Sequence, residues 1–118
     1  MSWSLDSDRP IFVQIIEHME YDIVSGALAP GAKIPSVREL ASEAAVNPNT
    51  MQRALSEMER RRLMYTERTS GRYVTDDESV IAELKKNIAA AAVDGFVAQM
   101  KKLGLDKEEV LDLLRENY

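Results

Sequence analysis

Two short helical segments separated by a break of only a few residues constrain this chain more than any other feature. Ser36 and Glu39 have the S-x-x-E spacing of a capping box, which predicts a helix over residues 37–45. Residues 46–48, Val-Asn-Pro, end this helix and start another, because Asn47 can cap a helix whose first residue is proline. Two short helices joined by so tight a turn are typical of a helix-turn-helix.

The segments on either side of this motif complete a small domain. Upstream, the helical periodicity of the apolar residues after Pro10 predicts an amphipathic helix that ends at Gly26. Downstream, the helix that begins at Pro48 is followed by two short runs rich in β-branched and aromatic residues, 63–67 and 71–75. These runs predict a strand hairpin. A hairpin directly after a helix-turn-helix is the wing of a winged helix.

From residue 77 onward the pattern is helical only. An apolar stripe continues for more than six turns until Gly104, and a last helix opens at Asp106. We therefore expect a winged helix-turn-helix domain over residues 9–76 and a helical segment over residues 77–118. The fold class predicted for the whole chain is mainly α, with a small β-hairpin wing and a C-terminal helical hairpin.

The apolar stripe of the long helix predicts an association between two copies of the chain. A helix of about 25 residues spans roughly 37 Å, which is longer than a small domain can cover. Part of the stripe is therefore expected to meet a second copy across a two-fold axis, forming a homodimer. The residues assigned to this contact are Ile81, Leu84, Ile88, Ala92, Phe96 and Met100.

Charge is distributed unevenly along the chain. The net charge is −5, yet the window from Lys33 to Thr75 holds eight basic residues and only five acidic ones. Seven of these eight bases are arginine, the side chain suited to bidentate contacts with phosphates and base edges. An acidic body with a cationic middle indicates nucleic acid as a partner, and a solvated helix face is an equal alternative on charge alone.

Composition excludes several other classes of protein. With no cysteine and one histidine, the chain has little material for a metal site, and five glycines form no phosphate-binding loop. The sequence shows no candidate catalytic nucleophile paired with a general base. We therefore expect no enzymatic activity, no cofactor and no metal. The absence of cysteine, of a signal peptide and of a long apolar run predicts a cytoplasmic protein.

The two helices of the central motif carry a family resemblance. Residues 34–41, IPSVRELA, and 46–54, VNPNTMQRA, resemble the GntR family of bacterial transcription regulators. The VNPNT-QRA run and the ending GLDKEEVLDLL, residues 104–114, are similar to the YtrA-type subgroup. The resemblance implies a winged helix that reads operator DNA as a homodimer, with the C-terminal helices supplying the dimer contacts.

The resemblance also implies which residues touch DNA. They lie at the start of the first helix of the motif, at the start of the second and on the wing: Ser36, Arg38, Asn47, Asn49, Thr50, Gln52, Arg53, Ser70, Gly71 and Arg72. An alternative for Arg38 is an ion pair with Glu39 or Glu43. For Arg60, which shares a face with Arg53, a solvated surface position is an equal alternative to phosphate contact.

Two positions depart from the family pattern. Arg62 stands where the family has a glycine in the left-handed conformation, and a non-glycine residue there costs on the order of 1 kcal/mol. How the second helix of the motif ends is therefore left open. Thr69 replaces a glycine two residues before Gly71, which leaves the conformation of the wing tip open.

The function expected from these observations is a sequence-specific DNA-binding transcription regulator, a repressor that binds a pseudo-palindromic operator as a homodimer. The alternative is a winged-helix adaptor that binds other proteins and no operator. A small-molecule effector is left open as a further partner, and neither the operator sequence nor the regulated genes follow from the chain.

Overall fold

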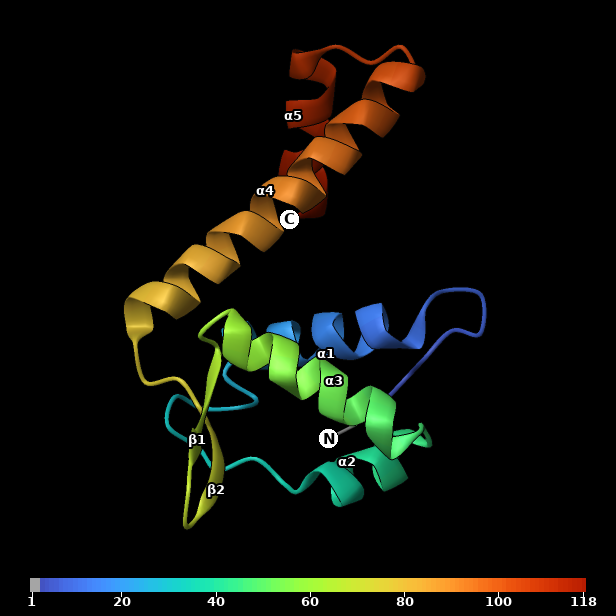
Figure 1. Cartoon of the computed structure of the whole chain (residues 1–118). Helices are drawn as coiled ribbons and strands as arrows, with labels where there is room; N and C mark the ends of the chain where they lie inside the picture. The colour runs from blue at the N-terminus through green and yellow to red at the C-terminus, as the bar shows by residue number, and fades with distance from the viewer. Residues whose placement is uncertain (1–2) are drawn as a thin grey trace. The chain divides into compact units, whose positions relative to one another are not determined.

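The computed structural model describes residues 3–118, which form five helices and one hairpin within that range (Figure 1). In chain order these are α1 (Ile11–Ser25), α2 (Val37–Ala44), α3 (Pro48–Arg60), β1 (Met64–Glu67), β2 (Gly71–Val74), α4 (Glu78–Lys102) and α5 (Lys107–Asn117). The predicted fold class is confirmed: a helix-turn-helix made by α2 and α3 is followed directly by an antiparallel wing.

The core lies where α1, α2 and α3 meet the inner face of the hairpin. Its members are apolar side chains at helical spacing on the three helices, together with residues that flank or belong to the wing. The largest of the fully buried side chains are Ile15, Met19, Ile23, Leu40, Met51, Leu55, Met58 and Val74. The buried face of α3 consists of Met51, Ala54, Leu55 and Met58, which lie at helical spacing.

Helix α3 ends with Arg62 in the left-handed conformation, at φ 65°. The amide of Arg62 donates to the carbonyl of Glu59 at 2.9 Å, and the amide of Leu63 donates to the carbonyl of Met58 at 3.0 Å. This is the Schellman arrangement, and Leu63 is buried. The helix thus ends as it would with glycine, because two hydrogen bonds and one buried side chain offset the strain at Arg62.

The wing contains a third extended segment that the sequence patterns do not indicate. In the hairpin, β1 pairs with β2 in a register that places Thr66 opposite Arg72. Residues 31–34 lie along the other side of β2: the amide of Ile34 donates to the carbonyl of Arg72 at 2.9 Å, and the amide of Val74 donates to the carbonyl of Ala32 at 2.9 Å. The chain entering α2 is thereby tied to the wing.

The chain divides into two compact units, one ending at Leu84 and the other beginning at Lys85. The first unit extends beyond residue 76, where the sequence places the end of the winged helix domain. The reason is that Val80, Ile81 and Leu84, in the first turns of α4, pack against the core.

The second unit contains most of α4 and all of α5. Gly104 turns the chain at φ 79°, and α5 starts with a capping box in which Asp106 accepts from the amide of Glu109 at 2.9 Å. No residue of α4 or α5 is buried. Val93, Val97, Leu103, Leu113 and Leu114 are large apolar side chains exposed in this unit. In the part of the chain that the structure describes, no helix is long and apolar enough to cross a membrane.

Candidate nucleic-acid interface

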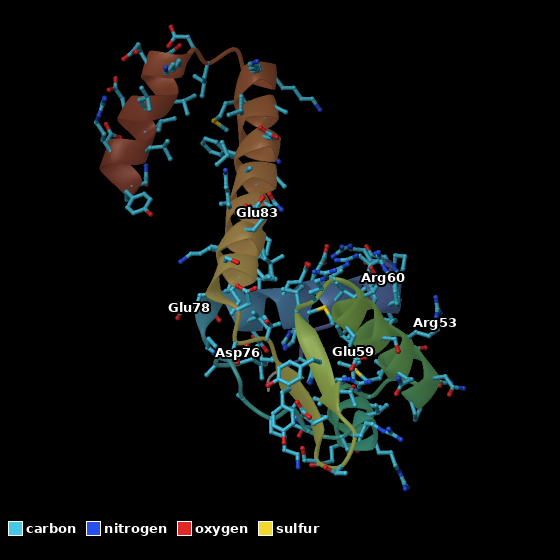
Figure 2. All side chains as sticks on the ribbon, turned by 60° about the vertical axis from the view of Figure 1, so that its left-hand side comes forward. Arg53, Glu59, Arg60, Asp76, Glu78 and Glu83 are labelled. Carbon is cyan, nitrogen blue, oxygen red and sulfur yellow. The ribbon has the colours of Figure 1, made fainter. Side chains whose placement is uncertain are left out.

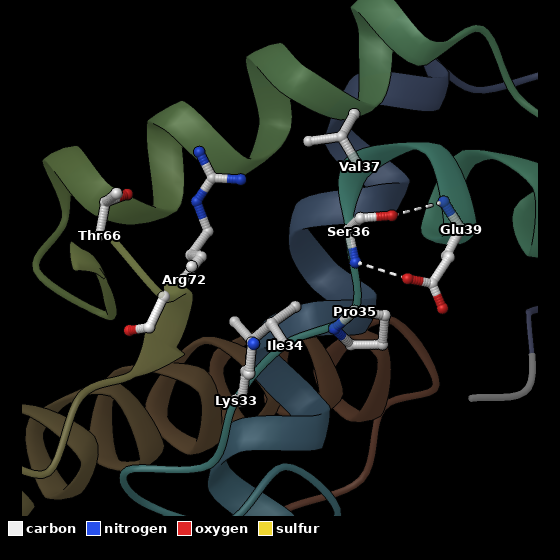
Figure 3. A pocket seen from close by; sticks show the side chains of 10 residues that line it. Lys33, Ile34, Pro35, Ser36, Val37, Glu39, Thr66 and Arg72 are labelled. Carbon is white, nitrogen blue, oxygen red and sulfur yellow. Dashed lines mark hydrogen bonds between the residues drawn. The ribbon is translucent and has the colours of Figure 1, made fainter. Parts of the chain in front are cut away.

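The start of α2 is held by a complete capping box (Figure 3). Ser36 Oγ accepts from the amide of Glu39 at 3.2 Å, and Glu39 Oε1 accepts from the amide of Ser36 at 3.3 Å. The carboxylate of Glu39 is therefore committed to the backbone. Arg38, on the same turn, is exposed, and its side chain has no ion pair or hydrogen bond with any of residues 3–118. The alternative ion pair with Glu39 or Glu43 is not formed.

The start of α3 presents short polar side chains to solvent. Asn47 Oδ1 accepts from the amide of Asn49 at 2.7 Å, so Asn47 caps the helix as predicted. Asn49 and Gln52 are exposed, Thr50 is half-buried, and Gln52 donates to Ser56 Oγ at 3.1 Å. Because Met51 and other residues of the opposite face are buried, this polar face is fixed outward.

Two arginines assigned or considered for DNA contact are engaged within the chain. Arg53 is exposed on α3 (Figure 2). Its guanidinium lies over the ring of Phe12 from α1, 4.8 Å from the ring centroid. Arg60 donates to Glu57 at 2.5 and 2.8 Å while remaining 72% exposed. Arg60 therefore lies at the surface, as its alternative assignment expected, and forms an ion pair with Glu57 that was not predicted from the sequence.

Glu57 organises the C-terminal end of α3. Hydrogen bonds from Arg60 and then Arg61 lower the pKa of its carboxyl to about 2. Arg61 also donates to Glu20 of α1 at 3.1 Å, so the network joins α3 to α1. These carboxylates pair with Arg60 and Arg61, whereas Arg62 is exposed and has no ion pair within residues 3–118.

On the wing, Arg72 points toward α3 and away from the tip (Figure 3). Its Nε donates to Glu59 Oε1 at 2.9 Å, and its side chain is only 17% exposed. The alternation of residues along β2 indicates that the Arg72 side chain lies on the inner face of the hairpin. Alternate residues of a strand share a face, and Arg72 is two residues from the buried Val74.

The tip of the wing is formed by Arg68, Thr69 and Ser70. All three are exposed, and Ser70 Oγ accepts from the hydroxyl of Tyr73 at 2.8 Å. Arg68 has no ion pair within the described residues. Arg68 is absent from the residues assigned to DNA contact from the sequence, because the family resemblance pointed to Arg72 instead.

A cavity of about 630 Å³ lies between the wing and the start of α2 (Figure 3). Its lining brings together Ser36 of the capping box with Ser70, Gly71 and Arg72 of the wing, and adds Lys33, which sequence reasoning missed. A side chain at Gly71 would be strained, because φ there is 127°, and its Cβ would lie 3.1 Å from Lys33 Cε, so that Lys33 would have to shift. The first turn of α2 and the wing therefore face one shared concave surface.

The sequence matches known proteins over nearly its full length. The sequence model for bacterial regulatory proteins of the gntR family matches residues 12–74. An uncharacterized HTH-type transcriptional regulator of Bacillus subtilis, YhcF, is 44% identical over 95% of this chain and 93% of its own. The HTH-type transcriptional repressor YtrA of the same organism is 32% identical over 93% of this chain and 85% of its own.

Solved structures agree with these relatives. A GntR family transcriptional regulator from Listeria monocytogenes has a TM-score of 0.89 at 38% identity, covering 95% of this chain and 98% of its own. The DNA-binding domain of AraR, solved in complex with an operator, has a TM-score of 0.54 at 26% identity, covering 64% of this chain and 94% of its own.

Proposed function

Since the chain belongs to the gntR family of bacterial regulatory proteins and is a transcriptional regulator with the DNA-binding domain of that family, we propose that it binds a pseudo-palindromic operator as a homodimeric repressor. The observation that carries this proposal is the shared concave surface between the wing and the first turn of α2, with the free Arg38 beside it. The AraR domain solved with its operator, and the repressor name of YtrA, support it.

The proposed contacts divide into two classes. Arg38, at the start of α2, and the wing contact phosphates, because their cationic and hydroxyl groups stand at a helix start and a strand tip. Asn49 and Gln52 read base edges, since carboxamides pair bidentately with adenine. Phosphate contacts give affinity, and the start of α3 gives sequence preference. We place the regulator in the cytoplasm, with the bacterial DNA, and in the YtrA-type subgroup, on its likeness to YtrA over most of both chains.

The homodimer is proposed to form through the second unit. Of the stripe assigned to it, Ile81 and Leu84 already pack on the core of the first unit. Ile88, Phe96 and Met100 are only half-buried, and Ala92 is exposed. An apolar surface of this kind, on helices with no buried residue, supports coverage by a second copy. Two-fold symmetry would place the two copies of α3, the proposed recognition helix, about 34 Å apart, which is one turn of DNA.

One experiment tests the operator and the dimer together. The full chain is used to select binding sites from random double-stranded DNA, and its sedimentation is followed at tens of micromolar. We expect enrichment of a sequence with two symmetric half-sites, and a dimer. The variant with Ile88→Glu and Phe96→Glu should sediment as a monomer and bind the full site no better than a half-site. Failure to enrich any sequence, or a monomeric parent, would overturn the proposal.

A further inference from the structure

One carboxylate of the recognition helix receives hydrogen bonds from both strands of the wing. Thr66 of β1 and Arg72 of β2 are direct partners in the hairpin register, so their side chains share one face. Both donate to the same oxygen, Oε1 of Glu59 on α3: Arg72 through its Nε at 2.9 Å, and Thr66 through its hydroxyl. Figure 2 shows Glu59 on the side of α3 next to the hairpin.

The two charged groups in this contact are partly withdrawn from solvent, whereas Thr66 is exposed. The side chain of Arg72 is 17% exposed and that of Glu59 is 30% exposed. Burial raises the pKa of the Glu59 carboxyl, but the hydrogen bonds from Thr66 and Arg72 outweigh it, and the pKa is lowered. The carboxylate is therefore charged at neutral pH and bonded to a guanidinium, an arrangement stronger than a neutral hydrogen bond.

We propose that Glu59 is a positioning residue that fixes the wing to the recognition helix, and that Arg72 acts inside this contact and not as a DNA ligand. This inference rests on the proposed operator binding and specifies how that site is assembled. The wing's phosphate contact is then made by Arg68, which is exposed at the tip and has no ion pair within residues 3–118.

The alternative role of Arg72 makes the opposite prediction for Glu59. If Arg72 binds a DNA phosphate, Glu59 competes with the DNA for the guanidinium, and removing the carboxylate strengthens operator binding. If Glu59 positions the wing, removing it leaves the hairpin free to move relative to α3. The hairpin must then become ordered when DNA binds, and the entropic cost of that ordering lowers the affinity for the operator. The sign of the change separates the two roles.

The experiment compares Glu59→Ala with Glu57→Ala in the full chain. Both variants remove one negative charge from α3 and introduce the residue most favourable to helices. Glu57 is bonded to Arg60 and Arg61 and not to the wing, so it controls for the charge change. We expect Glu59→Ala to weaken binding of the selected operator about tenfold relative to Glu57→Ala, the size of one charge-assisted hydrogen bond.

The salt dependence of affinity identifies the phosphate ligand. Each phosphate contact contributes about 0.9 to the slope of log affinity against log salt concentration. Arg68→Gln should reduce this slope by that amount. Arg72→Gln should lower the affinity and leave the slope unchanged, and it should add no further loss in the Glu59→Ala background. A reduced slope for Arg72→Gln, or tighter binding by Glu59→Ala than by Glu57→Ala, would overturn the proposal.

A measurement without DNA separates this inference from the proposed function. Amide hydrogen exchange of the free protein should become faster at residues 66–72 in both Glu59→Ala and Arg72→Gln, while exchange of the core amides of α3 stays unchanged. Faster exchange confined to the wing supports the positioning contact even if the parent binds no operator. Unchanged exchange in the wing overturns it even if operator binding is confirmed.

Discussion

The guanidinium of Arg53 lies over the ring of Phe12, with its central carbon 4.8 Å from the ring centroid. Arg53 belongs to the recognition helix and Phe12 to the first turn of α1, so this contact joins two helices far apart in the sequence. Phe12 also packs against the core, which holds the ring in place. The ring thus acts as a fixed platform beneath an exposed cation next to the proposed DNA-binding face.

We expect Arg53→Gln and Phe12→Leu to be coupled energetically. A cation over an aromatic ring at an exposed site contributes about 0.5–1 kcal/mol, and Leu keeps an apolar side chain at position 12 but removes the π face. Chemical denaturation of the two single variants and the double variant should show a coupling of that size. Strictly additive losses would mean that the contact contributes nothing to stability.

Replacing Arg38 by Ala should weaken operator binding by roughly 1–3 kcal/mol without changing the melting temperature, because the side chain is exposed and unpaired within the described chain. Arg60→Ala is the matched control: it removes the same charge, but its guanidinium is already bonded to Glu57. Titrations at one salt concentration should show a clearly smaller loss for Arg60. Equal losses for the two variants would contradict the special role of Arg38.

Replacing Gly71 by Ala should destabilise the wing by about 1–3 kcal/mol, the cost of a residue held in a sparsely populated backbone conformation. The backbone at Gly71 has φ 127°, and the added Cβ would also press on Lys33. Gly95→Ala provides the control, because a Cβ at Gly95 in α4 meets nothing within 4 Å. Thermal unfolding should show a loss for Gly71→Ala and no loss for Gly95→Ala; a tolerated Gly71→Ala would refute the constraint.

The stability of the protein should depend on Glu57 in acid. Its pKa is lowered from 4.5 to about 2 in the folded chain, so folding favours the charged carboxylate. The contribution of Glu57 is therefore fully present above the unfolded value and is lost as the pH falls from about 4.5 toward 2. The free energy of unfolding should differ between the parent and Glu57→Gln near neutral pH, and this difference should shrink through that range. A constant difference would argue against the shift.

Local sequence signals determined the helices and the residues at which α2 and α3 begin. The capping box of Ser36 with Glu39 and the cap at Asn47 are confirmed, because each depends on residues only two or three positions apart. The apolar spacing of α3 determined its buried face for the same reason. The side chains that cap the start of a helix are its close neighbours in the sequence, so their spacing is sufficient to predict where the helix begins.

Only the tertiary structure decided which of the arginine side chains form ion pairs within the chain. Arg38 and Arg68 have no ion pair within residues 3–118, whereas Arg72 is bonded to Glu59, 13 positions earlier in the chain. It also decided that Arg62 takes the left-handed conformation without glycine, and that residues 31–34 pair with β2. The bond between Arg72 and Glu59 depends on the relative placement of α3 and the hairpin. That placement is set by burial of the shared core, because burial free energy is summed over many residues and is not carried by any local motif.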